Sequence, residues 1–427
     1  MKIKEPDETG RILIVDDEED FRDLLSEIIS GSGYRTFTAA DGLQALGLVR
    51  QQDVDVALID FIMPHLDGLQ LMRQLKKIDR EIAVIFITGH GSIESAVNAM
   101  KEGAYDYITK PIQFEELENL LKRLFETKKL RRENRQLKRI LRQKYNFENI
   151  VGNSPAMMTV KREIEAASQN REVVWICGET GTGKELIAKT IHFNSARASA
   201  SFVPSDCSVL KEQRLLDEWL GREESTGPDK GYSKLGVFRT ANKGTVFLQE
   251  IFALSKKAQK ILLQILLTGE VFPIRAEKAI PVDVRFIITG KIDLQEMIDE
   301  NQFNIKLFDL LNAHKIDLPS LKDRKDDIPL LIRHFFQQEA DDISVDENAL
   351  QILQRYHWPE NVWELQNVLQ SALAIQSNRK IGVKDLPGYL TKSVNQNLKP
   401  LHQIEKEAVL HTLAVCNGDY TLAAKIL

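Results

Sequence analysis

The chain has 427 residues, of which 43% are hydrophobic and 28% are charged, and its formal net charge is −5. This length predicts two to four domains, and the charge balance excludes a chain that is basic throughout, although a local basic patch stays open. The three cysteines show no metal or disulfide spacing, and no signal peptide or 18-residue apolar run is visible, which predicts a cytoplasmic protein with reduced thiols and no membrane span.

Short apolar runs alternate with helical patterns from Arg11 to about Phe125. Such alternation predicts a parallel, doubly wound sheet of the flavodoxin-like kind, in which chemistry gathers at the carboxyl ends of the strands. The runs span residues 12–15, 56–59 and 83–87, with a weaker one at 105–108.

The carboxyl ends of these runs carry Asp16, Asp17, Asp60, Thr88 and Lys110. Crowded carboxylates raise one another's pKa unless a divalent cation pairs with them, and an all-oxygen site suits Mg²⁺. We expect Asp60 to be a nucleophile toward a phosphoryl group, with Lys110 and Thr88 stabilising the product. Alternatively, the aspartates cap helices, but capping would not also require the threonine and the lysine.

The sequences VDD, DFIMPHLDG, FITG and YITKP resemble the receiver domain of two-component response regulators over residues 10–125. The resemblance implies that Asp60 accepts a phosphoryl group from a sensor histidine kinase, and that Tyr107 is an aromatic switch. The implied Mg²⁺ ligands are Asp16, Asp17, Asp60 and the backbone carbonyl of Ile62.

Residues 117–144 contain neither proline nor glycine and predict one long helix, which makes residues 126–148 a helical linker. Its apolar seam has four-three-four spacing and predicts a short coiled coil, in which an asparagine favours two strands. Residues 121–144 hold eleven Lys/Arg against two Glu, which favours a solvated basic face over nucleic-acid contact. The seam consists of Leu130, Asn134, Leu137 and Leu141.

A predicted strand at 173–177 is followed by GETGTGKE and by a helix from about Glu185. This order is the context of a phosphate loop, whose glycines let backbone amides approach phosphates while the lysine supplies a positive charge. The general pattern has Ser or Thr after the lysine, where this sequence has Glu185. The alternative interpretation is a glycine-rich turn that binds no ligand. The candidate nucleotide-binding residues are Gly178, Glu179, Thr180, Gly181, Thr182, Gly183, Lys184 and Glu185.

With GTVFLQE, DVRFIITGKIDL, LPSLKDRKDDIPLLIRHFF and WPENVWELQNV, this loop resembles the AAA+ domain of NtrC-like activators from about Ile150 to Leu390. These bacterial enhancer-binding proteins use ATP to remodel sigma-54 RNA polymerase, and their loop also has glutamate after the lysine. The resemblance implies ATP or ADP as ligand, an α/β subdomain over residues 149–340 and a helical lid over residues 341–392.

Several working positions of that family are replaced in this chain. Glu250 is kept and could still orient a water molecule. The trans-acting arginines are not kept, and removing one such arginine finger costs roughly 10³–10⁵ in turnover. We therefore expect a pseudo-ATPase that binds ATP and hydrolyses it poorly or not at all. The replacements are Gln249 for the Mg²⁺-holding aspartate, Lys291 for a sensor asparagine, Asn304 and Leu310 for trans-acting arginines, and Trp363 for the lid's sensing arginine.

Local misalignment is the alternative for the segment with Asn304 and Leu310, but it does not explain Gln249 or Trp363. The polymerase-contacting signature of the family falls on STGPDK at 225–230, a turn sequence, so we expect that contact to be lost.

Residues 401–427 resemble the start of a Fis-type helix-turn-helix, giving a short all-α C-terminal segment. A helix-turn-helix reads bases with its second helix, which this sequence does not reach, so sequence-specific DNA binding is not expected. Dimerisation through these helices could persist.

The combined prediction is a sigma-54-type response regulator with a working receiver and a degenerate AAA+ domain. It would act through protein–protein regulation of transcription, as a homo-dimer, a higher oligomer or a hetero-oligomer with intact relatives. The alternatives are an active ATPase that uses substitute residues such as Lys291, a receiver that serves only as a phosphate sink, and the product of a decaying gene.

Overall fold

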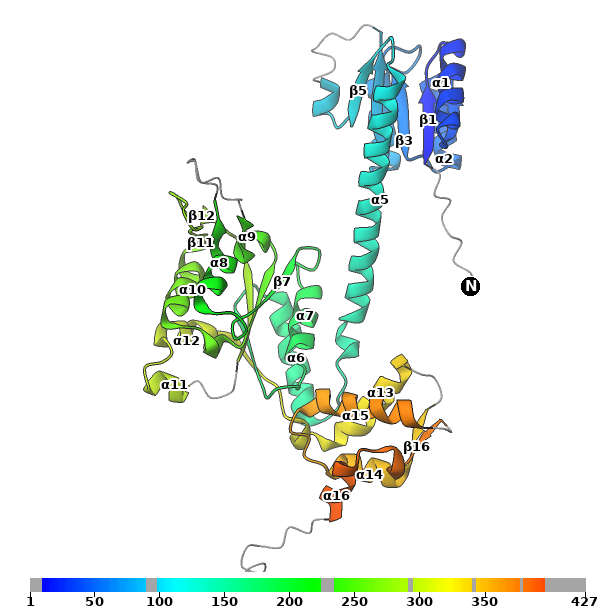
Figure 1. Ribbon diagram of the computed structural model, residues 1–427. Helices are drawn as coiled ribbons and strands as arrows, with labels where there is room; N and C mark the ends of the chain where they lie inside the picture. Colours follow the sequence, from blue (N-terminus) through cyan, green and yellow to red (C-terminus); the bar gives the residue numbers. More distant parts are fainter. Residues whose placement is uncertain are drawn as a thin grey trace, which may run out of the picture. The chain divides into compact units, whose positions relative to one another are not determined.

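The computed structural model describes residues 10–89, 98–223, 234–290, 295–339, 343–376 and 379–395 (Figure 1). The chain divides into two compact units, Met1–Leu137 and Lys138–Leu427, which are treated separately. Lys291, the segment 225–230 and the predicted helix-turn-helix at 401–427 lie outside the described residues. Within those residues, no helix has both the length and the apolar composition that crossing a membrane requires.

The first unit is a five-stranded parallel sheet in the order β2-β1-β3-β4-β5. Alternate strand residues face two cores, one under α2 and α3 and the other under α1 and α5. Because both faces are covered, the central strands are apolar along their length, as predicted for a doubly wound sheet. The elements are β1 Arg11–Val15, α1 Glu19–Gly31, β2 Arg35–Ala39, α2 Gly42–Gln51, β3 Val56–Asp60, α3 Gly68–Ile78, β4 Ala83–Thr88, β5 Asp106–Thr109 and α5 Phe114–Lys144.

The sequence does not predict β2, whose residues read RTFTA. Only Ala39 of this strand is fully buried, because β2 lies at an edge of the sheet and its other side chains are partly solvated. The remaining four strands coincide with the predicted apolar runs to within about two residues. An edge strand therefore carries too weak an apolar pattern to be read from the sequence alone.

Helix α5 confirms the long helix predicted over 117–144. Its first turns pack on the receiver sheet through buried leucines such as Leu117 and Leu124. Further along, the leucines of the predicted seam are exposed, Leu130 to 66% and Leu137 to 61%. The coiled coil stays a prediction, since exposure alone does not identify a partner.

The second unit contains a parallel sheet in the order β14-β6-β13-β10-β7, with α6 and α7 on one core and α8, α9, α10 and α12 on the other. Strands β6 and β10 both pair with β13, which brings their carboxyl ends close together. The strands are β6 Val174–Cys177, β7 Phe202–Asp206, β10 Thr245–Gln249, β13 Arg285–Gly290 and β14 Lys315–Asp317. The helices are α6 Pro155–Gln169, α7 Lys184–Phe193, α8 Glu212–Leu220, α9 Val237–Thr240, α10 Lys256–Thr268, α11 Gln295–Asp299 and α12 Ile305–Leu311.

A helical subdomain with its own core follows the second sheet. The predicted boundary after residue 340 would leave α13 outside this subdomain, but Ile328, Ile332 and Phe336 of α13 pack into its core. The apolar pattern of α13 fits either core, so the sequence cannot decide between them. The elements are η4 Leu321–Asp323, α13 Ile328–Glu339, β15 Ser344–Val345, α14 Glu347–Arg355, α15 Asn361–Ile375, β16 Lys380–Ile381 and α16 Gly388–Asn395.

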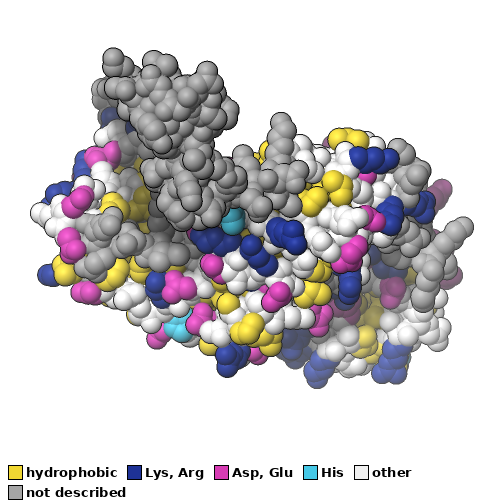
Figure 2. Space-filling view, turned by 90° about the horizontal axis from the view of Figure 1, so that it is seen from below, with side chains coloured by type: hydrophobic (Ala, Val, Ile, Leu, Met, Phe, Trp, Pro, Cys, Tyr) yellow, Lys and Arg dark blue, Asp and Glu magenta, His cyan; other side chains and the backbone are white. Residues whose placement is uncertain are grey.

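The surface agrees with the nearly balanced composition of the chain. Figure 2 shows one face on which Lys and Arg side chains, in dark blue, are interspersed with Asp and Glu side chains, in magenta. Among the described residues on that face there is no extended area of positive charge.

Candidate functional site

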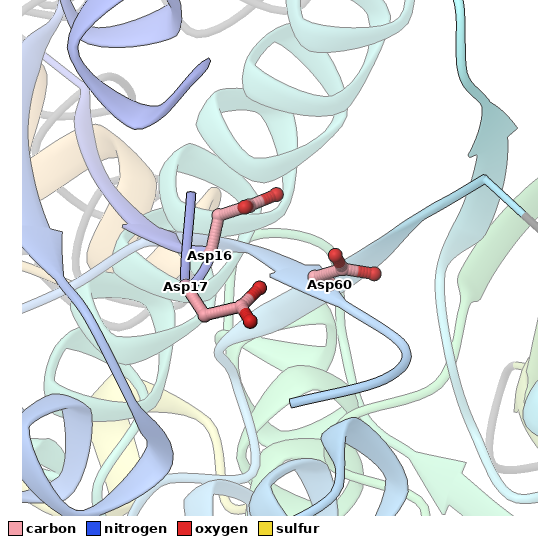
Figure 3. A group of neighbouring side chains, drawn as sticks. All are labelled: Asp16, Asp17 and Asp60. Carbon is pink, nitrogen blue, oxygen red and sulfur yellow. The ribbon is translucent and has the colours of Figure 1, made fainter. Parts of the chain in front are cut away.

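The receiver sheet brings the predicted acidic residues together at the ends of β1 and β3. Carboxylate oxygens of Asp16, Asp17 and Asp60 all lie within 4.8 Å of one another. Figure 3 shows the three side chains side by side at these strand ends. Asp16 is buried, Asp60 is half-buried and Asp17 is exposed, so the cluster is open to solvent on one side.

Lys110 enters the same cluster from the segment after β5. Its Nζ donates to Oδ2 of Asp16 at 2.9 Å and to Oδ2 of Asp60 at 3.2 Å. The ammonium also lies 4.1 Å from the centre of the Phe21 ring, an attractive contact with the face of the aromatic system. The sequence gives no sign of this contact, because Phe21 lies on the first turn of α1 and fits an ordinary core pattern.

Burial is the largest influence on the ionisation of Asp60. It raises the pKa of that carboxyl, the Asp16 charge raises it further, and Lys110 opposes both effects. Burial would lower the pKa of Lys110, but hydrogen bonds and charges of Asp16 and Asp60 outweigh it, so this pKa is raised. Three carboxylates and one ammonium leave two negative charges, which one divalent cation would balance.

The helix-capping alternative does not fit the geometry of these aspartates. The N-cap of α1 is Glu18, and its side chain makes no capping hydrogen bond. Asp16 instead accepts the Glu18 N–H at 3.0 Å within a short turn. Capping is done elsewhere in the unit, by Asp41 on α2 and Asp67 on α3.

The other predicted receiver residues stand around the cluster. Thr88 ends β4 and is buried, whereas Tyr107 on β5 is 44% exposed. The Ile62 N–H donates to Oδ1 of Asp60 at 3.4 Å. Sequence reasoning missed Gly68, where a Cβ would lie 2.5 Å from the Asp60 carbonyl oxygen. Glycine therefore lets α3 start against the end of β3.

The predicted phosphate loop connects β6 to α7. Gly181 and Gly183 adopt positive φ of 76° and 104°, which favours glycine, and a Cβ at Gly181 would lie 2.0 Å from the Glu360 carbonyl. Lys184 is folded onto the loop, its Nζ donating to the carbonyls of Gly178 at 2.9 Å and Glu179 at 3.0 Å. Burial lowers the pKa of Lys184, which Glu250 partly opposes.

Three family models together match most of the chain. A response regulator receiver domain matches residues 12–122, a sigma-54 interaction domain matches 150–317, and an AAA+ ATPase lid domain matches 322–402. The start of the lid match agrees with the helical core that begins at Leu321.

Curated relatives match over nearly the full chain. The regulatory protein AtoC of Escherichia coli (strain K12) is 35% identical, covering 98% of this chain and 95% of its own length. The transcriptional regulatory protein ZraR of the same organism is 34% identical, covering 97% and 96%. The chain belongs to the NtrC-like, sigma-54-type response regulators. The DNA-binding transcriptional regulator NtrC of Escherichia coli (strain K12) is 32% identical over 90% of this regulator and 82% of its own length.

Solved structures agree with this membership. NtrX from Brucella abortus in complex with ATP is 29% identical, with a TM-score of 0.60, covering 98% of this regulator and 96% of that chain. NtrX in complex with ADP is 31% identical with a TM-score of 0.58 and the same coverage.

The predicted counterpart of the family's acidic pair, Gln249 and Glu250, lies at the end of β10. Gln249 is the last residue of that strand, and Glu250 follows it with a φ of +54°. The Glu250 N–H donates to Oγ1 of Thr289 at 3.4 Å. Because β6 and β10 both pair with β13, the sheet brings the segments of Glu250 and Lys184 near each other, and the charge of Glu250 raises the pKa of Lys184 against the effect of burial.

The residues predicted to replace arginines of the family lie on α12 and α15. Asn304 is the N-cap of α12, its Oδ1 accepting from the N–H groups of Lys306 at 2.9 Å and Leu307 at 3.3 Å. Leu310 on the same helix is 37% exposed. The Trp363 side chain is 56% exposed, and the backbone N–H of this residue donates to the Gly181 carbonyl of the phosphate loop at 3.3 Å.

Proposed function

We propose that this response regulator is phosphorylated on Asp60 by a sensor histidine kinase in the cytoplasm. The observation that carries the proposal is the cluster of Asp16, Asp17 and Asp60, whose carboxylates lie within 4.8 Å of one another with Lys110 bound among them. The oxygen donors and the excess negative charge fit Mg²⁺, held by the three aspartates and the Ile62 carbonyl. Bound Mg²⁺ would supply positive charge against the transferred group.

The positions of these side chains support the following reaction. An oxygen of Asp60 attacks the phosphorus of phosphohistidine, the P–N bond breaks, and the leaving imidazole takes up a proton. Lys110 already bonds Asp60 at 3.2 Å, so its ammonium is placed to pair with the new phosphoryl oxygens. The hydroxyl of Thr88, at the end of the neighbouring strand, would donate a hydrogen bond to the same phosphoryl group. Tyr107 would respond to this change as the aromatic switch.

This part is tested with a small phosphodonor such as acetyl phosphate and Mg²⁺, followed by intact-mass measurement. The wild-type chain should gain one phosphoryl group and Asp60→Asn should gain none. Asp67→Asn, a change of equal size at the cap of α3, should be phosphorylated like the wild type. Equal phosphorylation of Asp60→Asn would overturn the assignment.

We further propose that the AAA+ domain binds ATP or ADP through residues 178–185 and turns ATP over poorly or not at all. Binding is supported by the glycine conformations and Lys184, and by the solved ATP and ADP complexes of NtrX. Weak turnover is supported by Gln249 and by Asn304, whose side chain is used within its own helix. Lys184→Ala should abolish nucleotide binding in a calorimetric titration, and binding that survives this change would contradict the proposed site.

A domain that binds without hydrolysing would act through other proteins. We propose that the regulator forms homo-oligomers, or mixed oligomers with intact relatives whose transcriptional activity it controls. Adding it to a relative that hydrolyses ATP should lower the ATPase rate per active subunit. An unchanged rate at equimolar mixing would exclude mixed oligomers.

A further inference from the structure

The phosphate loop of this regulator is bound directly to the helical subdomain. Three successive loop carbonyls accept hydrogen bonds from it. The Thr180 carbonyl oxygen accepts from Nδ2 of Asn361 at 2.9 Å. The Gly181 carbonyl oxygen accepts from the backbone N–H of Trp363 at 3.3 Å, and the Thr182 carbonyl oxygen accepts from Nη2 of Arg324 at 3.3 Å. The backbone that would hold phosphates is therefore held by hydrogen bonds from the lid.

Glu179 adds side-chain contacts to this backbone link. Its Oε1 pairs with Nζ of Lys322 at 3.1 Å, and its Oε2 accepts from Nδ2 of Asn361 at 3.1 Å. These two hydrogen bonds, that from Asn361 first, lower the pKa of the Glu179 carboxyl. This residue of the phosphate loop thus keeps its carboxylate charged and bonded to the lid.

Asn361 connects three separate segments through one side chain. It is fully buried at the start of α15, with a φ of +54°. Its Oδ1 accepts from the Leu321 N–H at 2.7 Å, while its Nδ2 reaches Glu179 and Thr180. Because these bonds use both ends of the amide, movement of the loop must move either α15 or the Leu321 segment.

We propose that Glu179 and Asn361 are positioning residues that make the lid follow the phosphate loop, so that bound nucleotide changes the lid without hydrolysis. This inference rests on the proposed nucleotide binding. It supplies a route from ligand to lid in a chain where Trp363 stands in place of the lid's sensing arginine. A ligand that favours one arrangement of two linked elements shifts both together.

Trp363 also provides the readout. The chain has four tryptophans, of which Trp175, Trp219 and Trp358 are buried and Trp363 is 56% exposed. Quenching of intrinsic fluorescence by acrylamide therefore reports chiefly on Trp363, beside the loop. With the full-length chain, saturating ADP should lower the quenching constant about twofold as lid and loop close on the ligand.

We call the contacts of Glu179 with Asn361 and Lys322 the clamp. Variants separate the effect of the clamp from nucleotide binding itself. Glu179→Ala and Lys322→Ala change side chains that are 42% and 49% exposed, so both should fold. Lys322→Ala, which lies outside the proposed binding residues, should still bind ADP by calorimetry and lose part of the quenching response. Glu179→Ala should lose the response at ADP concentrations that the calorimeter shows to be saturating. Glu179→Gln should keep most of it, because its amide oxygen still accepts from Asn361. Lys325→Ala, a lysine on the same segment that bonds the Arg355 carbonyl rather than the loop, should respond like the wild type.

The outcomes distinguish the two proposals. If the wild type binds no ADP in the calorimeter, nucleotide binding fails and the clamp proposal falls with it. If ADP binds and both Lys322→Ala and Glu179→Ala respond as fully as the wild type, nucleotide binding stands and the clamp is wrong. Trp363→Phe, which removes the exposed indole, must abolish the signal; a surviving signal would mean that the response does not come from the lid.

Discussion

Lys110 shows how few residues set the chemistry of the receiver. Its ammonium contacts Asp16, Asp60 and the ring of Phe21, and it is mostly buried. The cluster holds three carboxylates and this one ammonium, so the Asp60 carboxylate lies close to other negative charge and is partly desolvated. Without a cation, this arrangement should cost stability, which makes the folded state sensitive to the charge of Asp60.

Neutralising Asp60 should stabilise the regulator at neutral pH. Burial raises the pKa of Asp60 in the folded chain, so its contribution to stability is full below the unfolded pKa and is lost as pH rises through the folded one. In a metal chelator, Asp60→Asn should raise the free energy of unfolding at neutral pH by on the order of 1 kcal/mol.

Urea titrations of both chains provide the measurement. The difference in the free energy of unfolding between Asp60→Asn and the wild type should shrink as the pH falls, and it should vanish by about pH 4, near the pKa of a free aspartate. A variant that is no more stable than the wild type at neutral pH would show that Lys110 fully compensates the crowding.

Trp363 should make the nucleotide site indifferent to the third phosphate. A neutral indole cannot pair with it, whereas a hydrogen bond to a charged group contributes about 1.5–3 kcal/mol. We expect ATP and ADP to bind the wild type with affinities within about threefold, and Trp363→Arg to favour ATP by roughly tenfold. Calorimetric titration measures both, with Trp363→Phe as the control. A strong ATP preference in the wild type would contradict this.

Helix α12 illustrates a change of role at the scale of an element. Asn304 stands where relatives are expected to present an arginine, and it caps its own helix. Removing such a cap costs about 1 kcal/mol. Asn304→Ala should therefore lower the free energy of unfolding by about that amount, whereas Asn304→Asp, an equally good cap, should not. Equal stability of all three chains in urea would show that the cap contributes nothing.

Helix α5 should pair through its exposed seam. Leu137→Glu removes an apolar contact from each strand of the predicted coiled coil, and burying a leucine contributes about 1.5–3 kcal/mol. The dimer dissociation constant should rise about tenfold or more in sedimentation equilibrium. Ile140 is also exposed, at 50%, but lies outside the seam, so Ile140→Glu should have little effect. Equal effects of both changes would place the interface elsewhere.

At the scale of the whole molecule, the sequence predicted what depends on strand ends and local motifs. Asp16, Asp60 and Lys110 lie at the carboxyl ends of strands of one parallel sheet, so their meeting could be expected. The phosphate loop needed only its own glycines and the flanking elements. Both sites were read from spacing because adjacent strand ends share one edge.

Features that depend on long-range packing could not be read in the same way. The Glu179–Asn361 contact joins residues 182 positions apart, and neither residue stands out in its own segment. The boundary near residue 340 was misplaced because α13 has an apolar face that suits either core. Edge strand β2 was missed because its burial is weak.

The measurement that tests the regulator's proposed action most directly pairs nucleotide binding with steady-state hydrolysis on the purified full-length chain. It should be made with and without phosphorylation of Asp60, and with the hydrolysis of an active relative as reference. We predict saturable binding of ATP and ADP with no turnover above the Lys184→Ala background in either state. Turnover of about one per second or faster, within the ordinary enzyme range, would show that Gln249, Asn304, Leu310 and Trp363 do not disable the AAA+ domain.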